Sequence, residues 1–165
     1  MSISIGDRVP EATLTESTEF GEACPVAPTP VPVLEALKGK RVVIFGLPGA
    51  YTPTCSSKHV PGYIEHLSQL KAKGINEVWC VSVNDGYVMA AWGRDQKAIG
   101  KVRMLGDGSA DFTKKLGLEV EIPGMGVRMR RFSMLVDDGV VKQLNVEGPG
   151  KFAVSDAGTM LKQLG

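Results

Sequence analysis

The stretch RVVIFGLPGAYTPTCSSKHVPGY, from Arg41 to Tyr63, predicts how this chain folds and where its chemistry lies. Val42 to Gly46 is a short run of apolar and small residues, which is typical of a buried strand. Leu47 to Ala50 then interrupts the run with a proline and a glycine. We therefore expect a strand and a turn, with a helix starting just beyond them.

The helix start carries the candidate nucleophile. Thr52 is a residue type that caps helices, Pro53 suits the first helical position, and Cys55 then falls in the first turn. Unpaired backbone N–H groups and the positive end of the helix dipole favour thiolate over thiol at this position. A free cysteine can also be no more than a small core residue, but the setting favours a reactive Cys55. Thr52 lies on the same helix face, where its hydroxyl can serve the sulfur as well as cap the helix.

Length and charge restrict the class of protein. A chain of 165 residues with 43% hydrophobic residues fits one domain over residues 1–165. Nineteen basic against eighteen acidic residues leave a net charge of +1, which gives no electrostatic reason to expect nucleic acid or an anionic membrane as partner. No stretch approaches the roughly 20 apolar residues of a membrane span, and the start MSISIGDRVPEATL lacks the pattern of a signal peptide. We expect a cytoplasmic protein.

We expect the three cysteines to be reactive or inert thiols rather than members of a disulfide framework. Cys24, Cys55 and Cys80 are odd in number and widely spaced, and no CxxC occurs. With only two histidines in the chain, four close metal ligands are not available, so we expect no metal site. Cys24 lies in the proline-rich loop 21–33 and is either an incidental surface thiol or a resolving thiol. Cys80 lies in the apolar run VWCVSV and is either a core thiol or a resolving thiol.

The segment after the nucleophile predicts a parallel sheet. Beyond an interruption at Pro61, helical spacing of apolar residues over 63–73 precedes a second buried strand at 78–83. A helix over 88–98 and a short strand over 102–105 continue the alternation, which is typical of βαβ units.

The last third predicts an antiparallel arm. Two apolar runs at 132–136 and 140–146 flank Asp137-Asp138-Gly139, a strong hairpin signal. Residues 122–127 read as a glycine-broken loop, and Ser155 is the expected cap of a final helix over 155–164. The sequence thus predicts an α/β fold with a mixed sheet flanked by helices on both faces.

Residues outside the helix start could complete the site. Arg128, Arg130 and Arg131 cluster before the strand at Phe132, and spacing alone does not decide whether any of them reaches the thiol. His59, four residues after Cys55, could point toward the site or simply pack in the core. Further candidates are Pro48 and Pro53, which would shield the thiolate from water, and Gly49, which would offer close backbone approach and its N–H as a donor.

These residues also resemble a known family. The pattern Pro48-x-x-x-Thr52-x-x-Cys55 matches the active-site signature of peroxiredoxins, and PGAYTPTCSSKHVPGY is similar to the type II (atypical) subgroup of plants and of animal type 5 enzymes, in the redoxin superfamily. The similarity continues through EVWCVSVND at Glu77 to Asp85 and RRFSMLVDDGVVKQLNVEG at Arg130 to Gly148.

The resemblance implies a thioredoxin-like fold and a thiol peroxidase. It implies that Cys55 reduces hydrogen peroxide and organic hydroperoxides and becomes a sulfenic acid, with Thr52 beside it. It assigns the cationic role to Arg131, the arginine directly before the phenylalanine. It implies no metal, haem or flavin cofactor, and it suggests a homodimer that meets near the active-site loops.

The resemblance leaves the reducing half of the cycle open. Plant-like members carry a second cysteine at the position of Cys80, whereas animal-like members have their resolving cysteine where this chain has Ser155. Electrons would come from glutaredoxin with glutathione or from thioredoxin. Two other functions could use the same thiol. One is a peroxide sensor that passes oxidation to a partner, and the other is a thiol–disulfide oxidoreductase, although the absence of a CxxC motif weakens the case for the second.

Overall fold

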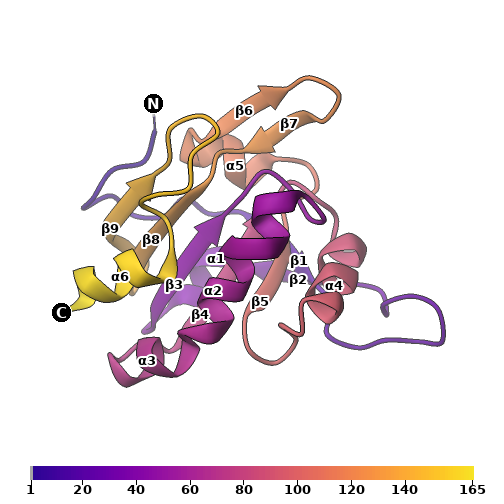
Figure 1. Ribbon diagram of the computed structural model, residues 1–165, viewed down its shortest axis with the longest axis horizontal. Helices are drawn as coiled ribbons and strands as arrows, with labels where there is room; N and C mark the ends of the chain where they lie inside the picture. The colour runs from indigo at the N-terminus through magenta and orange to yellow at the C-terminus, as the bar shows by residue number, and fades with distance from the viewer. Residues whose placement is uncertain (1) are drawn as a thin grey trace.

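A twisted seven-stranded mixed sheet forms the centre of the computed structural model, which describes residues 2–165 (Figure 1). The strand order is β2-β1-β5-β4-β3-β8-β9. The strands of this sheet are β1 (Thr13–Glu16), β2 (Thr29–Pro32), β3 (Arg41–Gly46), β4 (Glu77–Ser82), β5 (Arg103–Gly106), β8 (Phe132–Asp137) and β9 (Val140–Val146).

The middle of the sheet is the predicted parallel unit. β3 pairs parallel with β4, and β4 pairs parallel with β5, with helices in each connection. No helix within residues 2–165 combines the length and apolar character that crossing a membrane requires. The helices are α1 (Val33–Leu37), η1 (Cys55–His59, a π-helix), α2 (Val60–Glu65), α3 (Leu67–Ala72), α4 (Gly86–Asp95), α5 (Asp111–Leu116) and α6 (Ala157–Leu164).

The antiparallel arm is also as predicted. β8 and β9 form a hairpin whose turn residues Asp138 and Gly139 both have positive φ, 48° and 82°. Two positive φ angles are the requirement of the tight turn that matches strand twist. β8 in turn pairs antiparallel with β3 and places Phe132 opposite Gly46. This pairing brings the residue before Phe132 to the carboxyl end of β3.

Helices cover both faces of the sheet, as expected from the sequence (Figure 1). One core contains Val42, Ile44 and Trp79 of the strands together with residues of α1 and α5. The other contains Phe45 and Cys80 with residues of α2, α3, α4 and α6. Because neighbouring strand residues point to opposite faces, β3 contributes to both cores.

The prediction of a loop at residues 122–127 is wrong. A two-stranded ribbon forms there from β6 (Glu119–Ile122) and β7 (Gly126–Met129), which pair antiparallel. The glycines do not break the segment into a loop. Gly124 and Gly126 have φ near +80°, a conformation open to glycine, and they make the turn that lets the flanking residues pair.

Two helix boundaries also differ from expectation. Pro61 does not interrupt the helix: η1 runs directly into α2, His59 and Val60 are both in the αR conformation, and Pro61 lies at the second position of α2. The cap of α6 is Asp156, whose carboxylate accepts from the Thr159 N–H at 3.0 Å. Ser155 lies one residue before this cap, and its hydroxyl donates to Glu147 at 2.7 Å.

The carboxyl end of β5 leaves no room for a side chain, and this gives a stability prediction. A Cβ at Gly106 would lie 2.6 Å from the Asn84 carbonyl oxygen and 2.9 Å from the Gly86 nitrogen, both backbone atoms. Gly106→Ala should therefore lower the free energy of unfolding by about 1–3 kcal/mol, measured by urea denaturation. Gly62→Ala is the matched control, since nothing lies within 4 Å of its Cβ and it sits in a helix. An equal loss in both variants would contradict this packing argument.

Candidate active site

Cys55 lies at the start of a helical segment directly beyond the carboxyl end of β3. Pro53 and Thr54 are helical, and η1 begins at Cys55. The Val60 N–H bonds to the Cys55 carbonyl five residues back, which is the π-helical pattern. This wide turn buries Cys55 and His59 completely and leaves the residues between them outside the core. A single π turn of this kind often marks a functional position.

The loop that leads to Cys55 is held by the neighbouring strand. Asn84, just after β4, accepts hydrogen bonds through Oδ1 from the Ala50 N–H at 3.0 Å and the Ser82 hydroxyl at 2.6 Å. On the outer side of the same loop, the Tyr51 hydroxyl donates to Asp95 at 2.7 Å. The sequence pattern did not distinguish Asn84 as a supporting residue. Its position at the carboxyl end of a strand parallel to β3 is the signal that could have found it.

Arg131 is the arginine that contacts the thiol. Its Nη2 donates to Cys55 Sγ at 3.1 Å. The other two candidates make different contacts: Arg128 donates through Nη1 to the Pro48 carbonyl at 3.2 Å, and Arg130 donates through Nη2 to the Glu147 carbonyl at 3.2 Å. A guanidinium stays charged at any physiological pH, so a permanent cation touches the sulfur.

His59 fixes the orientation of Arg131. The Arg131 Nη1 donates to His59 Nδ1 at 2.9 Å, and since arginine cannot accept, Nδ1 must be unprotonated. The proton is then on Nε2, which donates to the Ser155 carbonyl at 3.1 Å. Burial, followed by the charge of Arg131, lowers the pKa of His59 to about 3. The imidazole is therefore neutral at physiological pH and holds the guanidinium without competing with the sulfur for charge.

Aromatic rings surround this contact. The Phe152 ring lies 5.8 Å from the Arg131 guanidinium carbon and 5.0 Å from the His59 ring centroid. Beneath them, Phe45 stacks on Tyr63 at 4.1 Å, and the Tyr63 hydroxyl donates to the same Ser155 carbonyl at 2.8 Å. Apolar walls strengthen the electrostatic contact between guanidinium and sulfur by keeping water away.

A buried carboxylate organises the segment that carries Phe152 and Ser155. Glu147 is 4% exposed, and it accepts from the N–H groups of Ala153, Val154 and Ser155 and from the Ser155 hydroxyl at 2.7–3.0 Å. Burial alone would raise the pKa of Glu147, but the hydrogen bonds from Ser155, Ala153 and Val154 outweigh it and lower the pKa. Nothing in the sequence pattern distinguished Glu147 beforehand.

Thr52 does not make the predicted capping bond. Its hydroxyl donates to the Gly49 carbonyl at 2.7 Å, and this uses its only proton. The helical segment has no side-chain cap at Thr54 either. The lone pairs of the Thr52 hydroxyl oxygen still allow this residue to accept a hydrogen bond from a ligand.

Of the other predicted residues, Pro48, Gly49 and Pro53, only Pro48 lines a pocket at this site. Pro48 is half-buried and lines a pocket of about 290 Å³, together with Thr54 and Arg131. A Cβ at Gly49 would lie 2.7 Å from Arg128 Nη1, so glycine is what lets that guanidinium reach Pro48. Pro53 is exposed and does not line the pocket.

The other two cysteines lie in very different places. Cys80 is fully buried on β4, opposite Phe45 in the parallel register. Burial, and then the charge of Cys55, raise the pKa of the Cys80 thiol well above its usual value. Cys24 is exposed in the loop before β2, and all three cysteines are free. The structure leaves both interpretations of Cys80 open.

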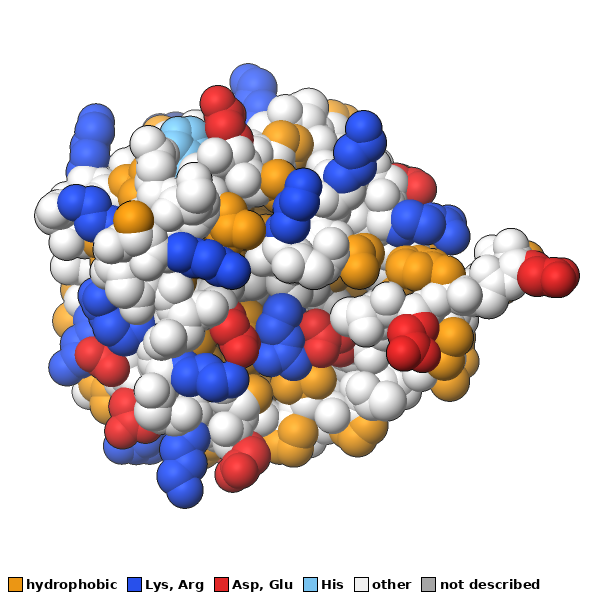
Figure 2. Space-filling model, turned by 90° about the horizontal axis from the view of Figure 1, so that it is seen from below, with side chains coloured by type: hydrophobic (Ala, Val, Ile, Leu, Met, Phe, Trp, Pro, Cys, Tyr) orange, Lys and Arg blue, Asp and Glu red, His pale blue; other side chains and the backbone are white. Residues whose placement is uncertain are grey.

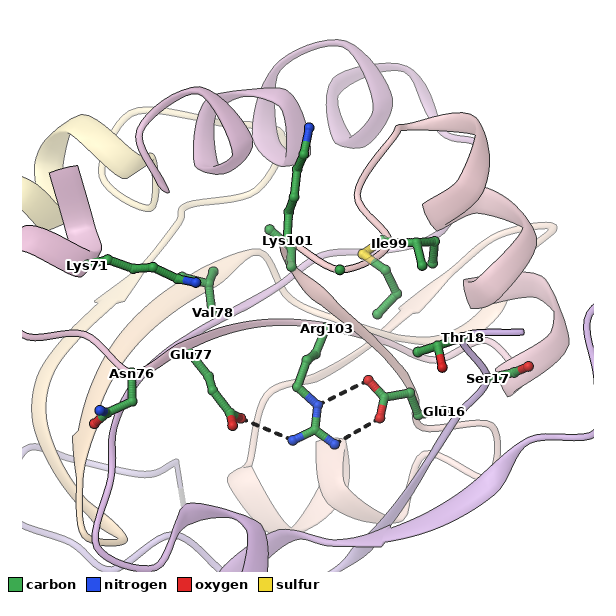
Figure 3. Close-up of a pocket in the computed structure, with 13 residues that line it drawn as sticks. Glu16, Ser17, Thr18, Lys71, Asn76, Glu77, Val78, Ile99, Lys101 and Arg103 are labelled. Carbon is green, nitrogen blue, oxygen red and sulfur yellow. Dashed lines mark hydrogen bonds and ion pairs between the residues drawn. The ribbon is translucent and has the colours of Figure 1, made fainter. Parts of the chain in front are cut away.

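A second pocket, at the opposite end of the sheet, is occupied by its own ion pairs. Arg103 donates to Glu16 at 2.8 Å and 3.0 Å and to Glu77 at 3.0 Å, at the amino ends of β4 and β5 (Figure 3). From below Figure 1, acidic and basic side chains are intermixed over the surface (Figure 2). These carboxylates satisfy the guanidinium, so this pocket is a structural ion-pair network.

The chain is similar to known proteins over almost its whole length. The Redoxin family model matches residues 4–161. Peroxiredoxin-2B of Arabidopsis thaliana is 47% identical, with 98% of each chain covered. The structure of reduced Prx3 from Vibrio vulnificus in complex with hydrogen peroxide is 48% identical, covers 99% of both chains and has a TM-score of 0.91. Peroxiredoxin 5 from Alvinella pompejana is 29% identical over 98% of this chain and 97% of its own, with a TM-score of 0.82.

The neutral state of His59 predicts how stability depends on pH. In the unfolded chain the imidazole binds a proton below pH 6.5, whereas in the folded protein it does so only near pH 3. Stability should therefore fall as pH drops below 6.5, by up to about 1.4 kcal/mol per pH unit from this group. His59→Gln should flatten the profile between pH 6.5 and pH 5, measured by urea unfolding. Parallel profiles for the two proteins would show that His59 takes up a proton in the folded state.

Proposed function

This chain belongs to the redoxin family and is a type II peroxiredoxin, an enzyme that reduces peroxides with a thiol, and we propose that Cys55 is the thiol that reacts. The observation that carries the proposal is the 3.1 Å hydrogen bond from Arg131 Nη2 to Cys55 Sγ. A guanidinium at this distance can donate to the sulfur and to an oxygen that reacts with it, which is what a thiol that attacks a peroxide needs.

The reaction we propose is a displacement at oxygen. The Cys55 thiolate attacks one peroxide oxygen, the S–O bond forms as the O–O bond breaks, and the other oxygen leaves as hydroxide or alkoxide and takes up a proton. Cys55 becomes a sulfenic acid. Arg131 lies where the negative charge moves from sulfur to the leaving oxygen, and its planar fork can donate to both.

Thr52 and the pocket would position the peroxide. Because the Thr52 proton is held by Gly49, the hydroxyl oxygen would accept a hydrogen bond from the peroxide O–H. The peroxide would enter through the pocket that Pro48, Thr54 and Arg131 line, because Arg131 also contacts Cys55 Sγ. Pro48 would shield the thiolate there, the Gly49 N–H is a further possible donor, and Pro53 would stiffen the start of the helix.

The sulfenic acid must then be reduced. We propose that the electrons come from glutaredoxin with glutathione or from thioredoxin. An incoming thiol would form a disulfide with Cys55 and release water, and a second thiol would restore the thiolate. Ser155 cannot form this disulfide, and its hydroxyl donates to Glu147. Cys80 is the remaining internal candidate, and its full burial favours the role of a core thiol.

Two further proposals concern the state of the protein in the cell. We propose a homodimer that meets near the active-site loops, because the aromatic residues Tyr51 and Tyr87 are 55% and 48% exposed beyond the carboxyl ends of β3 and β4. Sedimentation velocity measures this assembly directly. We also propose a cytoplasmic location, which suits three free cysteines. Among the relatives, some are named as chloroplastic or mitochondrial, and fractionation of the source cells tests the proposal.

Substitutions at the thiol and its cation test these roles. Cys55→Ser should abolish peroxide consumption. Arg131→Met should slow the peroxide step about 100- to 1000-fold, because one charged donor is lost, with an unchanged circular dichroism spectrum. Arg94→Met, at an exposed arginine on α4, is the control and should keep the normal rate. An unchanged rate in Arg131→Met would move the role to Arg128 or Arg130.

Cys80→Ser separates the two recycling routes. If Cys80 is a core thiol, the variant should keep the glutaredoxin-linked rate of the unaltered protein, measured as NADPH oxidation with glutathione and glutathione reductase. Parallel assays with thioredoxin and with dithiothreitol complete the set. Loss of the thioredoxin-linked rate alone, with the dithiothreitol rate intact, would identify Cys80 as the resolving thiol.

A further inference from the structure

The pocket beside the thiol is larger than hydrogen peroxide requires. Its volume of about 290 Å³ is roughly ten times the share of one water molecule in the liquid. Arg131, which touches Cys55 Sγ, lines this pocket. A hydroperoxide group at Cys55 would therefore leave most of the pocket for an organic substituent.

One wall of the pocket is apolar for a reason that lies in the strand pattern. Along β6, Val120 and Ile122 are half-buried and line the pocket, whereas Glu119 and Glu121 are exposed. Side chains alternate between the two faces of a ribbon, so the two carboxylates point away from the pocket. Together with Phe152 from the 147–156 segment, this wall suits a hydrocarbon chain or ring.

Two cations lie beside this wall. Arg130 and Lys151 both line the pocket, and within residues 2–165 neither forms an ion pair with a carboxylate. The Lys151 side chain folds back over Gly148, whose Cβ would lie 3.4 Å from Lys151 Cδ. The stem of Lys151 thus lies at van der Waals distance from position 148 on the pocket wall.

Glu147, the carboxylate that lines the pocket, does not pair with Arg130 or Lys151, so it leaves both cations available to an anion. Glu147 is 4% exposed, and its oxygens accept from three backbone N–H groups and the Ser155 hydroxyl. These donors satisfy the carboxylate from its own chain segment. With Arg131 engaged at the sulfur, Arg130 and Lys151 remain for an anionic group on the ligand.

We propose that this pocket selects organic hydroperoxides that carry a carboxylate at the far end of an apolar group, with the carboxylate at Arg130 and Lys151. The inference rests on the proposed role of Cys55 and adds the substrate class. The hydroperoxide would meet the sulfur, the apolar part would lie along Val120, Ile122 and Phe152, and the O–O bond would break as in the reaction above. The carboxylate is unchanged, and the product is the corresponding hydroxy acid.

The test compares two substrates that differ only in charge. Cumene hydroperoxide with a para carboxylate and the same compound with a para carboxamide are measured as kcat/KM, with dithiothreitol as reductant and hydrogen peroxide as the reference. We expect the acid to react at least about tenfold faster than the amide at low salt. In Lys151→Gln and in Arg130→Gln this ratio should fall toward one, and so should the ratio in 1 M salt.

A matched control and the hydrogen peroxide rate separate the possible failures. Lys142→Gln removes an exposed lysine of β9 that lies outside the pocket, and it should keep the acid preference. A ratio near one in the unaltered protein, or an equal ratio in Lys151→Gln, Arg130→Gln and Lys142→Gln, overturns the inference. If Cys55→Ser still consumes hydrogen peroxide, the proposed function fails instead, whatever the ratio.

Discussion

The antiparallel pairing of β8 with β3 is the constraint on which the site depends. It places Phe132 opposite Gly46, so that Arg131 reaches the thiol that follows β3 along the chain. Gly46 is required at this point, because a Cβ there would collide with the Phe132 ring and the Met129 sulfur. Cys55 follows β3, and Arg131, 76 positions later, directly precedes β8. The two residues form one site because β3 and β8 pack together with no side chain at Gly46.

The surroundings of Arg131 explain why its charge is available to the sulfur. No ion pair joins Arg131 to an aspartate or glutamate in residues 2–165. Its other contacts are the neutral His59 and the face of Phe152, which orient the guanidinium without neutralising it. A partly buried cation in an apolar setting is stabilised by an anion. Among the described residues, Cys55 Sγ accepts a hydrogen bond from this guanidinium at 3.1 Å, so the charge of Arg131 faces the sulfur that we propose as the nucleophile.

The sequence predicted the elements that depend on local pattern and missed those that depend on distant partners. The strand before Cys55 and the hairpin at Asp138-Gly139 follow from apolar runs and turn residues that lie side by side in the chain. Spacing could not choose among three arginines, because the choice depends on the register of β8 against β3. Ser155 was a reasonable cap by local rules, but α6 begins at Ala157 and Asp156 caps it, while the Ser155 hydroxyl donates to Glu147, eight residues earlier. The resemblance to a family supplied what spacing could not.

The burial of Cys55, the nucleophile that we propose, bears on how its sulfenic acid would be reduced. A protein thiol cannot touch a sulfur that has no exposed surface. Backbone must therefore move between oxidation and reduction. Cys80 lies on β4, which is paired on both sides by β3 and β5, so moving it would break two ladders. Cys55 lies in one π turn, whose side-chain anchors include the Trp92 to Ser56 hydrogen bond. Opening that turn would leave both ladders of β4 intact, so movement at Cys55 would disturb the sheet less than movement at Cys80.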